Sequence, residues 1–340
     1  MKPRWKAFGI LTAAIVAIGL ITLTYIAAMG YFQLDTKEVV KTVQYREGQE
    51  LIVELDDRGD VEITSWENDD IKVVGIKKTY FGKDQLDKIE LRVDEEEDVK
   101  ITSFHERKYD WIWMDIKVHI PEIMNVSLVR IETGDIHVRG IQGETKLKCE
   151  TGDIIIWSSH GNITAETETG DIWMNNQGKE DTNEDPVFGS GNFTFKTNTG
   201  DIWVKGLEHV VKAETSTGNV RVYECAMVDM VFSDTGYLKV WDCDLVHKVS
   251  GSTGEIDIKV LNISADGLEV DVDTGDIDIT VPMGINASYE ISTDTGSVGV
   301  DQDLPYEGSG SKTFKMGTIN GGGPMIRASS ETGNVRLKGE

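Results

Sequence analysis

Ten Thr-Gly dipeptides recur along the last two thirds of this 340-residue chain, each followed by a variable residue and then an aliphatic one. Successive copies are 18, 18, 30, 18, 18, 18, 21, 21 and 37 residues apart. A recurring period of this size is typical of stacked structural units, because each unit packs mainly on its two neighbours. The dipeptides begin at Thr133, Thr151, Thr169, Thr199, Thr217, Thr235, Thr253, Thr274, Thr295 and Thr332.

Each copy predicts two strands joined by a corner. The residues three and five places after every threonine are aliphatic or methionine, starting with Ile136 and Val138, and the residue between them varies. This is the period-two alternation of a strand with one buried face. A second apolar column lies four residues before each threonine, beginning at Val129. Glycine adopts positive φ at little cost and Asp or Asn bonds nearby backbone, which suits a sharp corner.

Such a repeat is compatible with one rung of a parallel β-solenoid or with one antiparallel hairpin of a meander. The recurrence of one residue type at each corner favours the solenoid, because rungs stacked about 4.8 Å apart place equivalent residues over one another. The predicted fold class is therefore all-β. It is a single parallel β-solenoid, or β-helix, of about 18-residue rungs, right-handed by the general crossover preference and preceded by one N-terminal transmembrane helix.

The domain organisation follows from shifts in composition. A corner at Gly59-Asp60 resembles the later ones without the threonine, and Arg336, Lys338 and Glu340 are expected to guard the C-terminal edge. The predicted segments are a basic cytoplasmic tip at 1–6, a transmembrane signal anchor at 7–29, a linker at 30–37, an irregular β cap with the first rungs at 38–130, and the repeat solenoid at 131–340 with an insertion at about 175–191.

The N-terminal segment predicts the location of the protein. Residues 7–29 carry no charge, follow Lys2, Arg4 and Lys6, and are long enough to cross a bilayer as a helix. A cleavable signal peptide is the alternative. Basic residues stay on the cytoplasmic side, so the prediction is a single-pass protein of the cell membrane with the bulk of its chain extracytoplasmic.

The charge balance restricts the class of partner. Residues 31–340 hold 31 basic and 59 acidic side chains, a net charge of −28. Such a surface excludes nucleic-acid binding and favours cations or basic partners. The expected partners are the membrane, through the N-terminal helix, and an envelope protein or glycan.

Cysteine and histidine give little chemistry. Of the three cysteines, Cys149 stands alone, whereas Cys225 and Cys243 lie one period apart and are expected to stack in the core as free thiols or as a disulfide between rungs. The six histidines have no metal-ligand spacing, and no nucleophile or phosphate-binding motif occurs. We therefore predict no catalytic residues and no organic cofactor.

Acidic residues gather at the corners. They could cap the corners structurally, or they could supply oxygen ligands to a hard cation such as Ca²⁺. Paired acids also leave open glycoside hydrolysis or lyase chemistry, although these acids recur with the corner instead of converging at one place. The candidate calcium ligands are Glu132, Asp135, Glu150, Asp153, Glu168 and Asp171.

The residue between the two core columns is apolar or aromatic in the first repeats and charged later. The predicted interaction patch is His137, Ile155, Trp173 and Trp203. It could stack sugars or dock a protein, or it could be covered by the insertion or by the N-terminal segment with Trp111 and Trp113. Five Asn-x-Ser/Thr triplets are candidate glycosylation sites, although Asn is also common at strand edges: Asn125, Asn162, Asn192, Asn262 and Asn286.

With these motifs, and with Ile120-Pro121-Glu122 and Val281-Pro282-Met283-Gly284, residues 38–340 resemble the prokaryotic putative-adhesin family of β-strand repeats, the LiaG-like domains of unknown function. The resemblance implies a β-solenoid in the cell envelope and offers no catalytic residues. The copy at Tyr237 departs from the motif.

The predicted function is a membrane-anchored extracytoplasmic scaffold or adhesion module without catalysis. The alternatives are a polysaccharide-active enzyme and a Ca²⁺-stabilised surface or envelope-sensing element.

Overall fold

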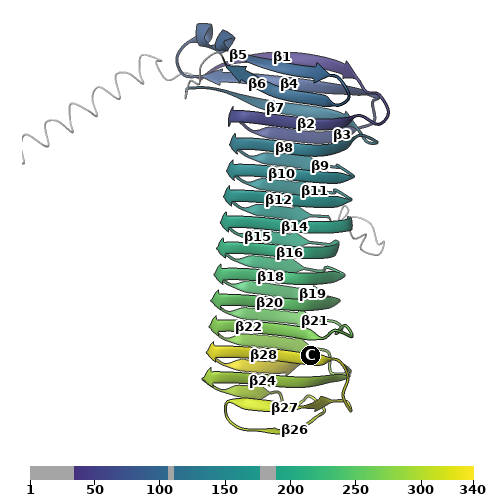
Figure 1. The fold of residues 1–340 in the computed structure, drawn as a ribbon, viewed down its shortest axis with the longest axis vertical. Coiled ribbons are helices and arrows are strands. Elements are labelled where there is room, and N and C mark those ends of the chain that lie inside the picture. Colours follow the sequence, from purple (N-terminus) through teal and green to yellow (C-terminus); the bar gives the residue numbers. More distant parts are fainter. Residues whose placement is uncertain (1–33, 106–110, 177–188) are drawn as a thin grey trace, which may run out of the picture.

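The computed structural model describes residues 34–105, 111–176 and 189–340. Two sheets of 14 and 15 strands, called sheet A and sheet B here, lie face to face along one elongated stack (Figure 1). The predicted tip at 1–6 and transmembrane segment at 7–29 lie outside the described residues, and so does most of the predicted insertion. No helix among the described residues has the length and apolar character that a membrane span requires.

Each repeat forms one rung, with a strand in sheet B, the Thr-Gly corner, and a strand in sheet A. The rung strands of sheet B are β2 (Glu50–Arg58), β8 (Asn125–Thr133), β10 (Glu144–Thr151), β12 (Asn162–Thr169), β14 (Gly189–Thr199), β16 (Leu207–Thr217), β18 (Met227–Thr235), β20 (Leu245–Thr253), β22 (Leu268–Thr274), β24 (Ala287–Thr295) and β28 (Met325–Thr332). Those of sheet A are β3 (Val61–Trp66), β9 (Ile136–Arg139), β11 (Ile154–Trp157), β13 (Ile172–Asn175), β15 (Ile202–Lys205), β17 (Val220–Tyr223), β19 (Leu238–Cys243), β21 (Ile256–Val260), β23 (Ile277–Val281), β25 (Val298–Val300) and β29 (Val335–Gly339).

Neighbouring repeats pair in parallel and in register. Thr151 of β10 lies opposite Thr133 of β8 on one side and opposite Thr169 of β12 on the other. The strands after the corner behave alike, with Ile154 of β11 opposite Ile136 and Ile172. This pairing excludes the antiparallel meander and confirms an all-β, solenoid-like stack.

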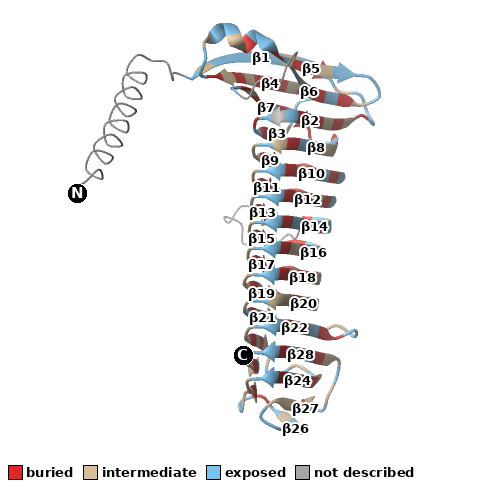
Figure 2. Ribbon diagram, turned by 60° about the vertical axis from the view of Figure 1, so that its left-hand side comes forward, coloured by how far each residue is buried: buried red, intermediate tan, exposed pale blue. Residues whose placement is uncertain are grey.

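The apolar columns form the interior that their spacing predicts. All thirty residues at the three inward positions of the ten repeats are buried, and the largest exposed fraction among them is 8%, at Val300. Figure 2 shows buried and exposed bands alternating along the rung strands. The two sheets therefore pool their side chains into one continuous hydrophobic core.

The N-terminal cap adds strands to both sheets. Its elements are β1 (Asp35–Gln44), β4 (Asp70–Thr79), the 3₁₀-helix η1 (Lys83–Lys88), β5 (Ile89–Glu95), β6 (Val99–His105) and β7 (Ile112–Pro121). The rung β2–β3 lies between this cap and the rung β8–β9. Because β1 extends to Asp35, where it pairs with Thr79, the prediction of a linker through residue 37 is wrong by three residues.

At the other end, the order of rungs in space differs from their order in sequence. The last rung, β28–β29, is inserted between the rungs β22–β23 and β24–β25. The 37-residue spacing allows this, because it accommodates a hairpin, β26 (Tyr306–Gly310) and β27 (Phe314–Ile319), which covers β24. Arg336 and Lys338 therefore guard no edge, and they pair instead with Asp278 of β23 at 3.2 and 2.9 Å.

Candidate functional site

The corners are built around glycines that tolerate no side chain. Gly170 has a φ of +147°, and a Cβ there would overlap the carbonyl oxygen of Gly152 in the preceding rung. The same overlap recurs at Gly254 against Gly236. Close approach of the backbones and positive φ together explain why the dipeptide repeats.

The polar residue after most corner glycines belongs to a ladder of hydrogen bonds between rungs. Oδ1 of Asp153 accepts a hydrogen bond from the backbone N–H of Asp171 at 2.7 Å, and Oδ1 of Asp171 accepts one from Asp201 at 2.7 Å. The ladder runs from Asp60 to Tyr237 and resumes from Asp276 through Asn334 to Ser297. Each side chain thus satisfies a corner N–H of the next rung.

A second ladder, which was not predicted from the sequence, is formed by the residues two places before most of the threonines. Thr167 donates its hydroxyl hydrogen to the carbonyl of Gly152 at 3.0 Å, and Cys149 donates its S–H to the carbonyl of Gly134 at 3.2 Å. Burial raises the pKa of the Cys149 thiol to about 11, so this cysteine is a structural donor and not a nucleophile. The signal was present in the sequence as a column of small hydroxyl residues.

A groove of about 370 Å³ lies on the outer face of sheet A, next to the corners after which β11, β13, β15 and β17 begin. Its lining residues are Asp153, Ile155, Asp171, Ile172, Trp173, Asp201, Trp203 and Arg221. The rings of Trp173 and Trp203 stack with centroids 4.9 Å apart and planes 9° from parallel. Trp157 lies against Trp173 at 4.0 Å, and Tyr223 lies against Trp203 at 6.0 Å.

The charge of this groove is mainly negative. Arg221 pairs with Asp201 at 3.0 Å, whereas Asp153 and Asp171 have no basic partner among the described side chains. Burial raises the pKa of Asp201, but hydrogen bonds from Asn219 and Arg221 outweigh it and leave the pKa below its ordinary value. Three carboxylates thus face one guanidinium.

Three of the four predicted patch residues line this groove. His137 lies one rung away, opposite Ile155, and does not line it. Trp157 and Tyr223 were not predicted as part of this row, because they stand two residues further along their strands and contact it diagonally. The proposed covering residues Trp111 and Trp113 contact Phe81 and Tyr80 in the cap instead.

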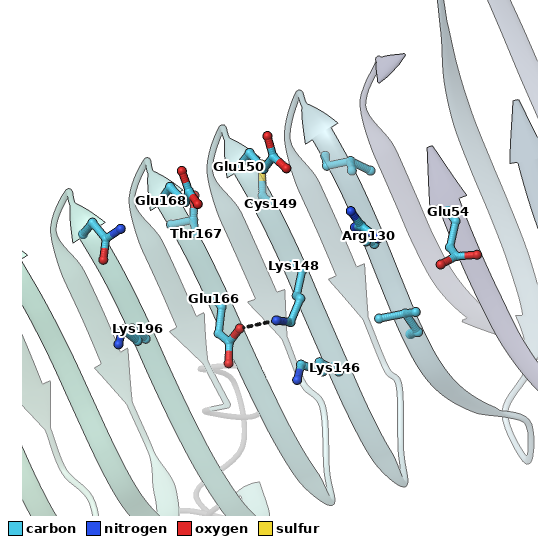
Figure 3. A pocket seen from close by; sticks show the side chains of 13 residues that line it. Glu54, Arg130, Lys146, Lys148, Cys149, Glu150, Glu166, Thr167, Glu168 and Lys196 are labelled. Atoms are coloured by element: carbon cyan, nitrogen blue, oxygen red, sulfur yellow. Dashed lines mark ion pairs between the residues drawn. The ribbon is translucent and has the colours of Figure 1, made fainter. Parts of the chain in front are cut away.

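Sheet B carries a larger hollow, of about 610 Å³, whose walls are charged (Figure 3). Lys148 and Glu166 form an ion pair across it at 2.7 Å, and Lys196 pairs with Glu214 at 3.6 Å. Opposite charges therefore neutralise one another between rungs, and this face offers no single sign of charge to a ligand.

The family model described as Toastrack DUF4097 matches residues 49–338. The chain belongs to this family. The resemblance to a family of β-strand repeats of unknown function is thereby confirmed, and no curated protein matches this Toastrack chain.

Solved structures resemble the Toastrack chain at low identity. A putative adhesin from Parabacteroides distasonis is 12% identical with a TM-score of 0.40, covering 89% of this chain and 98% of its own. A putative lipid binding protein from the same organism is 12% identical with a TM-score of 0.33, at 89% and 96% coverage. A putative cell adhesion protein from Clostridium sporogenes is 11% identical with a TM-score of 0.20, at 90% and 100% coverage.

The predicted calcium ligands of the Toastrack chain fall on two sides of the corners. Asp153 and Asp171 line the sheet A groove, whereas Glu150 and Glu168 line the sheet B hollow. Within residues 34–105, 111–176 and 189–340, no group of three or more His, Cys, Asp or Glu side chains is arranged to hold a metal. Calcium binding stays a prediction.

A carboxyl group with a raised pKa that lined a groove would support the enzymatic alternative, because a general acid must be protonated near neutral pH. Burial raises the pKa of Asp271, but this carboxyl lies near Lys248, at 3.7 Å, and lines neither the sheet A groove nor the sheet B hollow. The carboxylates that do line the groove have Oδ1 occupied by backbone donors at the corners.

Other predicted positions are placed but not linked to a function. All five asparagines of the Asn-x-Ser/Thr triplets are exposed, and glycosylation stays a prediction. Cys225 and Cys243 are buried free thiols in the structure, with the N–H of Cys225 3.5 Å from Sγ of Cys243. His209 and His247 bracket Asp229 at 2.7 and 3.0 Å, a row on sheet B that sequence spacing did not reveal.

Proposed function

We propose that this protein is a membrane-anchored, extracytoplasmic interaction module without catalysis, whose sheet A groove docks a basic segment of an envelope protein. The observation that carries the proposal is the row of Trp157, Trp173, Trp203 and Tyr223 beside the carboxylates of Asp153, Asp171 and Asp201. A half-exposed aromatic row bordered by acids is typical of a surface that receives apolar and basic side chains.

The arrangement of the rings favours a protein over a glycan. A sugar stacks on the free face of an aromatic ring, whereas the faces of Trp173 and Trp203 are turned toward each other and toward their neighbours. On Trp173 and Trp203, the ring edges are therefore the parts left for a ligand to contact. The alkyl stems of Lys or Arg can lie along these edges while their cationic ends reach the carboxylates.

The net charge supports the same class of partner. Residues 31–340 carry a net charge of −28. A basic protein is therefore attracted to the stack along its whole length, and an acidic protein is repelled. The uncharged stretch at 7–29, preceded by basic residues, supports attachment to the membrane with the stack outside.

The test uses the full chain in lipid nanodiscs, incubated with envelope extract from its own organism. We expect the captured material to be lost after protease treatment of the extract, to persist after periodate oxidation of its glycans, and to decrease with salt. The double variant Trp173→Ala/Trp203→Ala is expected to reduce capture at least tenfold. The matched variant Lys239→Ala/Asp257→Ala, on the same face two rungs further, is expected to leave it unchanged.

Capture that survives protease and fails after periodate would contradict the protein partner and assign the groove to a glycan. Equal capture by both double variants would reject the groove itself. Melting temperatures of the two variants, measured in parallel, separate lost binding from lost folding.

A further inference from the structure

The N-terminal cap exposes a cluster of aromatic side chains away from the groove. Tyr80, Phe81 and Trp111 are 42%, 60% and 41% exposed, although all three are large enough to be core residues. Phe81 lies against Trp111 with ring centroids 5.7 Å apart, and Tyr80 lies against Trp113 at 5.5 Å. We call Tyr80, Phe81 and Trp111 the aromatic edge.

The strand register places the aromatic edge beside the point where the chain enters the cap. Asp35, the first residue of β1, is opposite Thr79 of β4, and Thr79 is opposite Ile112 of β7. Tyr80 and Phe81 directly follow Thr79, and Trp111 directly precedes Ile112. All three aromatic residues therefore lie at one end of the strands β1, β4 and β7, the end at which β1 begins.

In the sequence, the apolar stretch at 7–29 ends shortly before β1. Five residues separate Met29 from Asp35, so even a fully extended chain reaches no further than about 20 Å. If residues 7–29 span the bilayer, as the proposed function holds, the start of β1 is confined near the membrane surface. The aromatic edge is then confined there as well.

We propose that the aromatic edge docks into the headgroup region of the membrane that holds the anchor, and so fixes the tilt of the stack. This inference rests on the anchoring in the proposed function. Trp and Tyr concentrate at membrane interfaces because their amphipathic rings sit at the level of the headgroups, and Phe buries its ring at the boundary between headgroups and acyl chains. A single anchor with a short linker leaves a rigid stack free to pivot, and a second contact at the same end restricts that pivoting.

The charges around the edge indicate that attachment depends on the rings. Lys83 is exposed, but Asp84 and Asp87 lie in the same helix, and Asp87 pairs with Lys37 at 2.6 Å. Among the residues that the structure describes, acidic and basic groups thus offset each other beside the aromatic edge. Docking is therefore expected to be insensitive to salt and to need no anionic lipid.

The experiment places an environment-sensitive fluorophore on the full chain in phosphatidylcholine vesicles that contain headgroup-proximal spin-labelled lipid. One sample carries the label at Lys83→Cys, next to the edge, and a matched sample carries it at Ser309→Cys in the distal hairpin. The native cysteines are buried, so unsubstituted protein serves as the labelling blank. Flotation with the vesicles reports anchoring independently of quenching.

We expect the label at position 83 to be quenched at least threefold more than the label at 309, with no change at 0.5 M salt. Phe81→Ser, and separately Tyr80→Ser/Phe81→Ser/Trp111→Ser, are expected to remove most of the difference while flotation persists. A floating chain with equal quenching at both positions would overturn docking and leave anchoring intact.

Three other outcomes of the quenching experiment would also contradict the docking of the aromatic edge. Self-quenching between labels at position 83 without lipid quenching would assign the edge to a second copy of the chain. Quenching that disappears in salt would assign the contact to charge, against the proposal. A chain that does not float would reject the anchor of the proposed function, and docking with it.

Discussion

The rungs from β8–β9 to β16–β17, called the first rungs here, and those from β18–β19 to β22–β23, called the later rungs, share one interior but differ at their corners and outer faces. In the first rungs, Asp or Asn caps the next corner, and Thr or Cys binds the glycine carbonyl in most of them. In the later rungs, Tyr237 and Glu255 interrupt the first ladder, and Gly251 and Val272 interrupt the second.

The outer face changes one rung earlier, at Arg221 of β17. Trp173 and Trp203 occupy the position between the core columns in the first rungs, and Lys239 and Asp257 occupy it in the later ones. Because both groups of rungs stack in register with buried inward columns, the fold requires neither the aromatic row nor an unbroken ladder. The aromatic groove is therefore a local addition to a scaffold that stands without it.

The corner glycines should show the largest effect, and should show it in both groups of rungs. Gly170→Ala and Gly254→Ala each force a Cβ into a carbonyl oxygen at a positive φ, so we expect losses of at least about 3 kcal/mol in stability or failure to fold. Gly299→Ala, where the same atom meets open space, is the control and should change stability by less than about 0.5 kcal/mol. Chemical denaturation measures all three, and a tolerated Gly170→Ala would contradict the close approach.

Removing a corner side chain should reduce stability only in rungs where that side chain caps the next corner. Asp171→Ala leaves the N–H of Asp201 without its acceptor and is expected to cost about 1 to 2 kcal/mol. Glu255 caps no N–H among the described residues, so Glu255→Ala at the equivalent corner should cost less than about 0.5 kcal/mol. Equal costs in urea unfolding would show that the carboxylate acts through something other than capping.

Acid should weaken the ladder where it resumes. A hydrogen bond from the N–H of Asn334 lowers the pKa of Asp276, with further lowering by Arg336 and partial opposition from burial. A lowered folded-state pKa contributes stability that is present above the unfolded value, about 3.9, and is lost as pH falls through the folded value. Asp276→Asn keeps an oxygen acceptor but loses the charge, so its melting temperature should approach that of wild type as pH falls from about 5 to about 2. A gap that widens would contradict this sign.

Calcium should have the smallest effect. The Oδ1 atoms of Asp135, Asp153 and Asp171 already accept backbone hydrogen bonds, and Glu150 and Glu168 line the sheet B hollow on the other side of the corner. We expect millimolar Ca²⁺, compared with chelator, to shift the melting temperature by less than about 1 °C, because a cation that does not bind cannot stabilise. A rise of several degrees that Asp153→Asn abolishes would instead establish the predicted calcium site.

Sequence patterns predicted the interior and the parallel stacking because both follow from period-two alternation repeated at fixed spacing. The insertion of β28–β29 between earlier rungs was beyond such reasoning, since spacing gives the length of a connection and not its destination. Trp173 and Trp203 were found because they occupy equivalent positions. Trp157 and Tyr223 were missed because their contact is diagonal across strands.

The central claim is that the aromatic groove of the first rungs binds a protein and that the later rungs of the same face do not. Site-specific photo-cross-linking in living cells tests it directly, with the reactive side chain placed at Ile155 in the groove or at Asp257 on the later rungs. We predict protein adducts from Ile155 that Trp173→Ala/Trp203→Ala abolishes, and none from Asp257. Equal adducts from the two positions, or none from Ile155, would contradict the account.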